Sequence, residues 1–596
     1  MTVKFLRRRW QKIFAVVLLI FLFLTTVVAY YINRYWSPIL ANELRSTVLN
    51  STDSLYQASF TDADLHIVQG KLVVFNLTIK PDQAVYQRRL KAGLAPNNLF
   101  SLKVKRIVFS NIHPLKLYFH QQLDIGKIVL SAPDLQLSYQ LNHKKDITVT
   151  HPMSAWQRIQ PMFRSIHIGQ VMLNDVKFKY KDYSGNKLDI SELKEINVLG
   201  KDLLIDSVTQ KDTSRFYCFK DVQVEVNNFA RPSDNGLYRY TIKQLLYSTL
   251  TSQLQAYGVG LVPAADSVFI KRNVRTWFTF NTDTLELSHF NFLKYNKYRM
   301  LNAANLTFRR GNFIVSTNPA TKPPKGNRLL TFPNVAVHLL HNDLTLDTVD
   351  LNNINITYRG HGKKSHKQGM LSFNNTNGSI YNITNNEAAL ARNNTMKLQL
   401  SSRLMDSGPM EADMTFNLTD SARSYTYKGT VGLMDLEDLN KATMPFGLVK
   451  ITSGWLDQLS FDIKANRYVS QGNVSFLYHD LKIHVLKIDT ATHQYRHRAI
   501  VSLLANALIV KRNNPDRIGY IPRTYEVKYV SQPDTAFFKS VWKTLAIGIK
   551  SAAGYNETVE KEVKQRIAQH AADKKKKERK KAIRIKRRAN HKHRKR

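Results

Sequence analysis

Alternation of apolar and polar residues with a period of two is the feature that most limits what this chain can form. The clearest example is residues 71–79, where every second side chain is apolar, as a strand with one buried face requires. That face comprises Val73, Phe75, Leu77 and Ile79. The same alternation recurs at 135–139, 222–226 and 474–478. The chain therefore has the pattern of many half-buried strands.

Turn-forming residues separate such runs. Asp234-Asn235-Gly236 and Thr376-Asn377-Gly378 both carry the Asn and Gly signature of a tight turn. Many strands divided by turns, with few helices, indicate a meander in which neighbouring strands run in opposite directions. The sequence therefore predicts a mostly β chain with a long, mainly antiparallel sheet.

One spacing of apolar residues occurs twice, 178 residues apart. The first copy comprises Ile166, Ile168, Val171, Leu173, Val176, Phe178 and Tyr180, and the second comprises Leu344, Leu346, Val349, Leu351, Ile354, Ile356 and Tyr358. A third copy, fitted with two inserted residues, comprises Leu123, Ile125, Ile128, Leu130, Leu135, Leu137 and Tyr139. Any two extended segments joined by a bend produce such a pattern, but we expect genuine structural repetition.

Three segments carry helical signals. Residues 82–91 form a short basic candidate that ends before Gly93, and residues 153–166 form a second that Pro161 interrupts. The third, 535–551, has five apolar residues on one helical face: Phe538, Val541, Trp542, Leu545 and Ile549. This helix either caps the end of the sheet with that face or lies in a membrane interface.

Residues 13–32 form an uncharged, largely apolar run of 20 residues. Such a run crosses a hydrocarbon core of about 30 Å as a helix. A cleaved signal peptide would have a shorter apolar core followed by a small-x-small site. Here the run ends in an aromatic belt that includes Tyr35 and Trp36. We therefore predict an uncleaved single-pass anchor, with residues 1–12 in the cytoplasm because they carry five basic side chains.

The net charge of +42 is concentrated at the two ends of the chain. Residues 573–596 contain fifteen Lys and Arg against Asp573 and Glu578, which gives +13, and residues 1–12 add +5. No zinc-finger spacing or other nucleic-acid motif accompanies this charge. The tail is either a solvated segment or a ligand for anionic head groups. The head-group candidates are Lys574, Lys575, Lys576, Lys577, Arg587 and Arg588.

Signatures of an enzyme are absent from the sequence. There is no nucleophile elbow, P-loop, zinc-binding His-Glu-x-x-His or dinucleotide fingerprint. The single cysteine, Cys218, excludes an intramolecular disulfide framework and multi-thiolate metal sites. His479-Asp480 has the context of a solvated turn pair. We expect no enzymatic activity, no cofactor, no metal site and no nucleic-acid partner.

The layout of a basic N-terminus, one anchor and a long β-rich body resembles the AsmA-like proteins of Gram-negative envelopes. Residues 58–79 look like the opening strands of that family, and residues 472–485 are similar to its late strand pair. Residues 100–139 resemble its motif of a strand, a turn and a further strand pair, carried by Pro114, Leu115, Ile125, Ile128, Leu130, Pro133, Leu135 and Leu137. The helix within 537–550 resembles the closing amphipathic helix of longer members.

The resemblance implies an elongated β-groove with an apolar lining, anchored in the inner membrane and projecting into the periplasm. It implies phospholipid movement towards the outer membrane, with phospholipids and possible envelope proteins as partners. The alternative is a scaffold for outer-membrane assembly or protein targeting that moves no lipid. Under this hypothesis the residues lining the groove are Val73, Phe75, Leu77, Ile79, Val176, Phe178, Tyr180, Ile354, Ile356 and Tyr358. Those at a membrane interface are Tyr35, Trp36, Phe538, Trp542, Leu545 and Ile549.

These expectations divide the chain into seven parts. They are a basic segment at 1–12, a transmembrane helix at 13–32, an N-terminal AsmA-like β region at 37–200, a middle β-groove region at 201–450, a C-terminal AsmA-like β region at 451–534, an amphipathic helix at 535–551 and a Lys/Arg-rich tail at 552–596.

Overall fold

The computed structural model describes residues 52, 54–66, 70–140, 142, 154–160, 163–183, 188–292, 295, 300–319, 321, 328–340, 343–489, 492–497, 510–532, 535–555, 565, 569, 572–573 and 576–583. Strands account for 57% of the chain and belong to a 23-stranded mixed sheet. The predicted mostly β architecture is confirmed. Within the described ranges no helix is long and apolar enough to span a membrane, and the anchor predicted at 13–32 lies outside them.

The chain forms two compact units. Unit 1 comprises the described residues of Met1–Pro232, Tyr240–Gly260 and Thr284–Ala304, and unit 2 those of Ser233–Arg239, Leu261–Asp283 and Asn305–Arg596. Four strands contribute residues to both units: β10 (Tyr238–Ser248), β11 (Gln253–Pro263), β12 (Thr276–Ser288) and β13 (Leu301–Thr317). Helix α6 (Asp266–Lys271) follows β11.

Unit 1 contains nine further strands: β1 (Tyr56–Ser59), β2 (Asp62–His66), β3 (Lys71–Pro81), β4 (Asn98–Ile112), β5 (Gln122–Ser131), β6 (Asp134–Tyr139), β7 (Ser165–Asp182), β8 (Asp189–Ile205) and β9 (Phe219–Pro232). Its helical segments are α3 (Gln83–Lys91), α4 (Pro114–His120), α5 (Ala155–Ile159) and η2 (Thr209–Lys211). Asp82 caps α3 and Ser154 caps α5, so both predicted N-terminal helices exist in shorter form. Both β5 and β6 pair with β7 in parallel, which makes the sheet mixed.

Strand β3 exists as predicted, but the predicted face is wrong. Its core contacts come from Leu72 and Val74 before Asn76 and from Leu77 and Ile79 after it. Asn76 has a positive φ of 52°, so the strand changes face there. As a result Val73 and Phe75 do not belong to the core that holds Leu77 and Ile79.

The internal repetition is real, and it includes the bends of the strands. Strands β7 and β14 are each 18 residues long. Each has a positive-φ residue in its middle, Asp175 and Asn353, which are 178 positions apart. Register shifts flank Val176 in the pairing of β7 with β8, and the equivalent Ile354 in β14 with β15.

The third copy corresponds to β5 and β6, which lie directly beside β7 in parallel. Ile125 pairs with Ile168, and Leu137 pairs with Tyr180. The offset is constant along both strands, so the two inserted residues of the sequence alignment are wrong. The first and third copies are therefore neighbours in the sheet.

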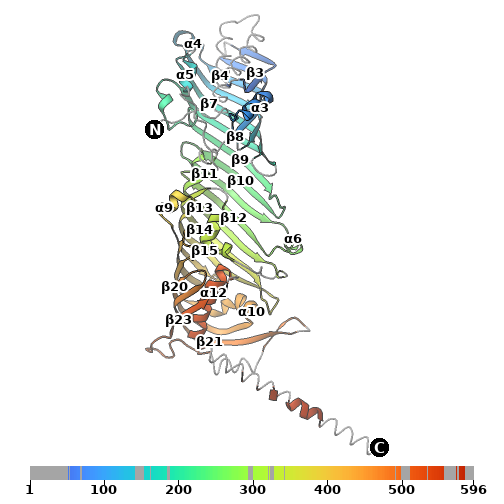
Figure 1. Ribbon diagram of the computed structural model, residues 1–596, viewed down its shortest axis with the longest axis vertical. Helices are drawn as coiled ribbons and strands as arrows, with labels where there is room; N and C mark the ends of the chain where they lie inside the picture. The colour runs from blue at the N-terminus through green and yellow to red at the C-terminus, as the bar shows by residue number, and fades with distance from the viewer. Residues whose placement is uncertain are drawn as a thin grey trace, which may run out of the picture. The chain divides into compact units, whose positions relative to one another are not determined.

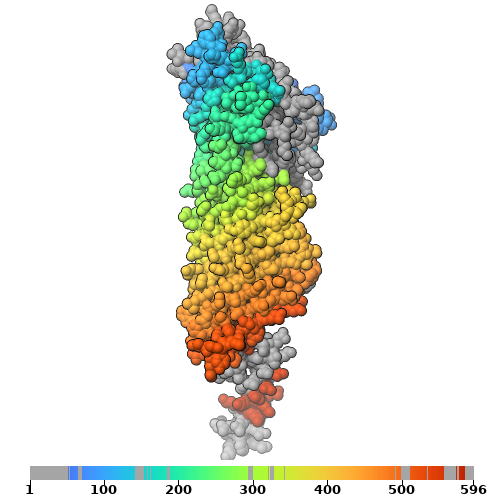
Figure 2. All heavy atoms as spheres, turned by 90° about the vertical axis from the view of Figure 1, so that its left-hand side faces the viewer, coloured from blue at the N-terminus to red at the C-terminus, as the bar shows by residue number. Residues whose placement is uncertain are grey.

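Unit 2 contains β14 (Leu344–His361), β15 (Gln368–Thr384), β16 (Thr395–Leu404), β17 (Gly408–Asn417), β18 (Tyr425–Val431), β19 (Met434–Asp435), β20 (Val449–Ala465), β21 (Val469–Ile488), β22 (Tyr495–His497) and β23 (Thr524–Val530). Its helical segments are η3 (Leu329–Thr331), α8 (Pro333–Ala336), η4 (Val337–Leu339), α9 (Glu387–Arg392), η5 (Leu436–Leu439), α10 (Asn440–Gly447) and α12 (Phe537–Ala552). From β14 onwards the pairing is antiparallel, and the strands follow one another nearly in chain order, which gives the oblique colour bands of Figure 2.

A polar crease crosses β12 to β15 where the strands bend. Asn312 bonds to Asn281 through its backbone N–H (3.2 Å) and to Asn355 through its side chain (3.2 Å). The side chain of Asn355 accepts from the backbone of Asn375 (3.0 Å), and that of Asn377 accepts from the backbone of Asn353 (2.9 Å). The turn predicted at 376–378 is therefore wrong. These residues lie inside β15, and short Asn side chains hold the bend instead.

Helix α12 lies against β21 and β23, as Figure 1 shows for the red helix of unit 2. Its buried residues are Phe537, Ser540, Thr544, Gly548 and Ala552. A Cβ on Gly548 would come within 2.5 Å of the Val474 side chain. The helix therefore approaches the sheet closely through a stripe of small residues, with Phe537 at one end.

Candidate functional site

The long strands of unit 1 share an apolar face. Three residues on adjacent strands, Leu173, Val198 and Val224, lie side by side in one row. A second row is formed by Val176, Ile196 and Val226. The face predicted for Val222, Val224 and Val226 is thus confirmed, because their partners Gly200, Val198 and Ile196 alternate in the same way. The opposite face carries polar groups such as Glu225, whose pKa is lowered by hydrogen bonds from Asn227 and Gln244.

This apolar face is covered in one part and half-exposed in another. At the start of β7, Ile166 and Ile168 are fully buried in the main core of unit 1. Along β9, Val222, Val224 and Val226 are only half-buried. An aromatic group lies in the part of unit 1 supplied by β10 and the end of β12, where Tyr247 contacts Phe290 and Phe292 at 5.9 and 5.6 Å between ring centroids.

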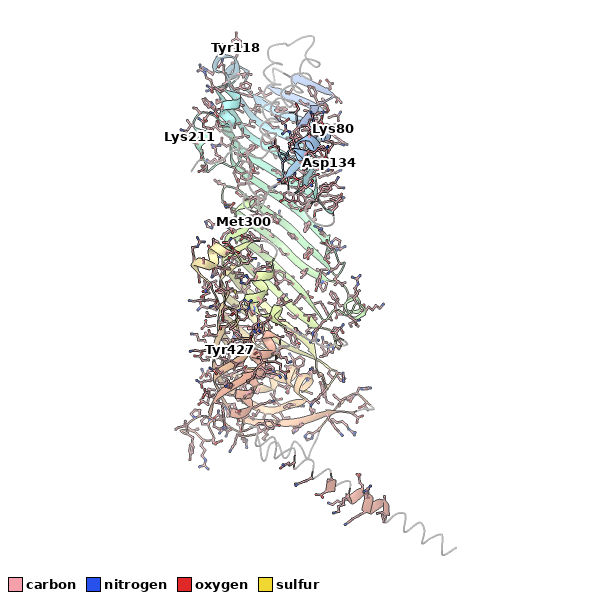
Figure 3. The ribbon with its side chains drawn as sticks, viewed as in Figure 1. Lys80, Tyr118, Asp134, Lys211, Met300 and Tyr427 are labelled. Carbon is pink, nitrogen blue, oxygen red and sulfur yellow. The ribbon has the colours of Figure 1, made fainter. Side chains whose placement is uncertain are left out.

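In unit 2 an apolar face also runs from strand to strand. Across β16 to β20, one row consists of Leu398, Met414, Tyr427 and Ile463. At the β18–β23 end, α12 closes this face completely: the Phe537 ring lies 5.2 Å from Tyr425 and 5.7 Å from Phe416. Tyr427, labelled in Figure 3, is 1% exposed. Burial raises the pKa values of the Tyr425 and Tyr427 phenols, so both stay neutral.

The other end of unit 2 has apolar side chains without such a cover. Four phenylalanines of β12 and β13 contact one another: Phe278 stacks on Phe313 (5.9 Å), and Phe280 meets Phe308 edge-on (5.6 Å). Phe278 is 39% exposed, and the other three rings are half-buried. These rings were not predicted as site residues, although Phe278 and Phe280 show period-two spacing in the sequence.

The predicted groove residues divide by burial. Val73, Leu77, Ile79, Val176 and Ile354 are buried, Phe75, Phe178, Tyr180 and Ile356 are half-buried, and Tyr358 is 41% exposed. Tyr180 bonds to Asp182 at 3.2 Å, and Tyr358 contacts Phe446 of α10 at 6.1 Å between centroids. Of the buried members, Leu77 and Ile79 belong to the packed core of unit 1. The half-buried members remain candidates for an apolar contact surface.

The predicted interface residues on α12 also divide. Leu545 and Ile549 pack against the core of unit 2, whereas Phe538 and Trp542 are exposed at 77% and 58%. Of the two alternatives, the helix does cover the sheet, but not with the predicted face alone: the small residues Ser540, Thr544 and Gly548 are the buried ones. That stripe was detectable in the sequence as small residues four positions apart.

The remaining predicted residues are either exposed or lie outside the described part of the chain. Lys576 and Lys577 are exposed. Tyr35, Trp36, Lys574, Lys575, Arg587 and Arg588 lie outside the described residues.

The polar face of unit 2 contains a hollow of about 380 Å³, lined chiefly by polar side chains of β17, β18, β20 and β21. Among them are Glu411, Asp413 and Asp462, with Lys428 at 3.7 Å from Asp413. The charged side chains in its lining make it unsuitable for an acyl chain. The apolar faces are therefore the better candidate site.

Three kinds of chemical centre bear on the site: a metal site, the His479–Asp480 pair and the Cys218 thiol. Within the part of the chain that the structure describes, no group of three or more His, Cys, Asp or Glu side chains could hold a metal ion. His479 does not pair with Asp480: its Nδ1 lies 3.0 Å from Asp457, and Asp480 binds Arg512. Burial raises the pKa of the Cys218 thiol to about 12, so it stays protonated near neutral pH.

No protein-family model matches the sequence, and no curated protein matches it.

Proposed function

We propose that this protein is a membrane-anchored, lipid-handling protein of the AsmA-like kind, in which half-exposed apolar strand faces contact phospholipid acyl chains. The observation that carries the proposal is the pair of apolar surfaces left partly open in the two units. They are the β7–β9 face of unit 1, with Val224 as its centre, and the Phe278–Phe313 group of unit 2. Burial of acyl chains on such surfaces is favourable by about 0.8 kcal/mol per CH₂.

The arrangement of polarity supports a non-specific apolar ligand. These strands have an apolar face and a polar face, so an acyl chain would contact only the apolar face. The absence of charged side chains from these rows suits hydrocarbon and leaves recognition of a head group to other residues. The run at 13–32 would keep the protein at the inner membrane, with its body in the periplasm. The phospholipids that it carries would move towards the outer membrane.

Site-specific photocrosslinking in the full-length chain tests this function. A photoreactive phenylalanine is placed at Val224 or Phe280 on the apolar faces, and at Gln223 or Thr279, their neighbours in the same strands, as matched controls. After irradiation in cells or in phospholipid membranes, mass spectrometry identifies any attached lipid. We expect lipid adducts at Val224 and Phe280 and few at the controls.

Equal labelling on both faces, or none on either, would contradict a lipid-conducting surface. Crosslinks to protein at Val224 and Phe280 would instead favour the alternative role, a scaffold for outer-membrane assembly or protein targeting.

A further inference from the structure

Residues 515–522 form an exposed apolar loop on unit 2 that the proposed function does not use. We name this loop the finger. Its tip presents Ile518 at 102%, Ile521 at 93% and Tyr520 at 60% exposure. A backbone hydrogen bond from Tyr520 to Arg517 (3.2 Å) closes a turn with Gly519 at φ 85°, a conformation that suits glycine. The turn therefore projects isoleucine side chains into solvent.

The base of the finger is held firmly. Asn514 is fully buried, and its side chain donates to the carbonyls of Phe476 (2.6 Å) and Arg523 (3.1 Å) while accepting from the Arg523 N–H (2.8 Å). The Arg523 guanidinium binds the carbonyl of Asn513 (2.6 Å), that of Ala552 in α12 (3.1 Å) and the Asp516 carboxylate (2.7 Å). Because these hydrogen bonds fix the base, the fold holds the apolar tip out in solvent.

The charge around the finger is basic. Residues 511–523 contain Lys511, Arg512, Arg517 and Arg523. Arg512 pairs with Asp480 and Arg523 pairs with Asp516, so Lys511 and Arg517 supply the surplus positive charge. Lys511 also donates its backbone N–H to Ala553, directly after α12 (2.9 Å). The chain therefore leaves α12 beside the base of the finger and continues towards the tail at 573–596, which carries +13.

We propose that the finger inserts into the surface of a bilayer containing anionic phospholipids. Isoleucine side chains that are accessible from every direction lose little exposure against a flat protein surface, because such a surface covers one side. A bilayer surrounds a protruding tip completely. Tyrosine beside the aliphatic tip and arginine at its base match the order of groups from acyl region to head groups.

This inference deepens the proposed function by naming a surface that brings unit 2 to a membrane, and it rests on that function only for the role of the contact. The test uses the full chain with Cys218 replaced by Ala and one new cysteine at Ile518, labelled with an environment-sensitive fluorophore. The control carries the cysteine at Ser421, an exposed polar turn residue of unit 2. Each protein is mixed with phosphatidylethanolamine–phosphatidylglycerol vesicles or with phosphatidylcholine vesicles, both containing brominated acyl chains.

We expect a blue-shifted emission and quenching by the brominated chains for the label at position 518, stronger with the anionic vesicles, and no change at position 421. A second pair of proteins carries the label at Tyr520, which is 60% exposed, with either Ile518→Ser and Ile521→Ser, or Leu433→Ser. Leu433 is an apolar residue of unit 2 that is 60% exposed. The double substitution abolishes the quenching, and the control substitution retains it.

A label at position 518 that stays water-exposed with both vesicles overturns the proposal. A blue shift without lipid that grows with protein concentration also overturns it, because the occupant is then a second copy of the chain. Loss of photocrosslinks at Val224 and Phe280 with intact quenching at position 518 separates failure of the proposed lipid pathway from failure of the finger.

Discussion

The two ends of unit 2 carry apolar side chains that differ in how far they are covered. At the α12 end they are sealed: Val474 and Ile463 are fully buried, and Phe537 inserts among Phe332, Phe416 and Tyr425. On β12 and β13 the same kind of side chain stays partly in solvent, and Phe278 is 39% exposed. The sealed end has the character of a protein core, in which volume changes are costly. The open end resembles a binding surface, where stability depends less on each ring.

The substitution Phe537→Ala is expected to have the largest effect on stability. Its ring is 1% exposed and contacts four other aromatic rings. Removing it leaves a cavity under the helix, so we expect a loss of about 3–5 kcal/mol in the free energy of unfolding of unit 2. Chemical denaturation measures this loss. Phe538→Ala is the matched control: its ring is 77% exposed and meets Phe537 edge-on at 5.1 Å, so its removal should cost only about 0.5–1.5 kcal/mol. Equal costs would show that α12 does not seal the face.

A second test enlarges a small residue instead of deleting a large one. In Gly548→Val the new Cβ would lie 2.5 Å from Val474, so the helix has to move away from β21. Overpacking of this kind costs about 1–3 kcal/mol. Limited proteolysis after Lys543 and Lys550 follows the loosening of the helix. Ala546→Val, at a half-buried position of the same helix, should leave the cleavage rate close to wild type. Rapid cleavage of both variants would assign the effect to helix propensity.

Two features of these regions show what the sequence could and could not predict. Period-two spacing correctly placed Val222, Val224 and Val226 on one face, because those residues lie in an unbroken part of β9. It failed at residues 71–79, where Asn76 reverses the face. The Asn and Gly turn signature failed at 376–378, where a bend inside β15 resembled a turn. A positive φ at Asn or Asp inside a strand depends on hydrogen bonds from neighbouring strands, and sequence spacing alone does not contain those bonds.

The candidate site shows the same division. Helix 535–551 was predicted correctly as amphipathic, yet two of its three aromatic residues, Phe538 and Trp542, face solvent. Hydrophobicity favoured them for burial, but the short distance to β21 admits only small side chains such as Ser540 and Gly548. The aromatic pairs of β12 and β13 required knowledge of which strands are neighbours. Burial of a face therefore depended on close approach between elements, which composition does not encode.

A third test addresses the bends that separate the apolar segments. Asn353 and the equivalent Asp175 both have φ values above 50°, a region that β-carbon sterics disfavour. We expect Asn353→Ala to destabilise unit 2, and Asp175→Ala to destabilise unit 1, each by about 1–2 kcal/mol. Asn353→Gly and Asp175→Gly are the controls, and denaturation of each should stay near wild type because glycine adopts this conformation freely. Different behaviour at the two sites would limit the structural repetition to the pattern of apolar residues.

The smallest expected effect on stability belongs to the open end. In Phe280→Ser the ring loses its edge contacts with Phe308 and Phe313, at 5.6 and 6.5 Å. Such contacts contribute about 0.5–1.5 kcal/mol per pair, and a half-buried ring removes less apolar area from water than Phe537 does. Unfolding experiments should therefore show a loss near 1 kcal/mol, well below that of Phe537→Ala.

The same substitution should have a large effect on lipid contact. Because Phe280 lies in the centre of the uncovered aromatic group, Phe280→Ser should reduce lipid photocrosslinking from a probe at Phe313, while Asn281→Ser on the polar crease should not. A stability loss as large as that of Phe537→Ala, with unchanged crosslinking, would mean that the open end is a packed core as well. A small stability loss with reduced crosslinking is the result that a lipid-contacting surface requires, since its rings remain partly in solvent until an apolar ligand covers them.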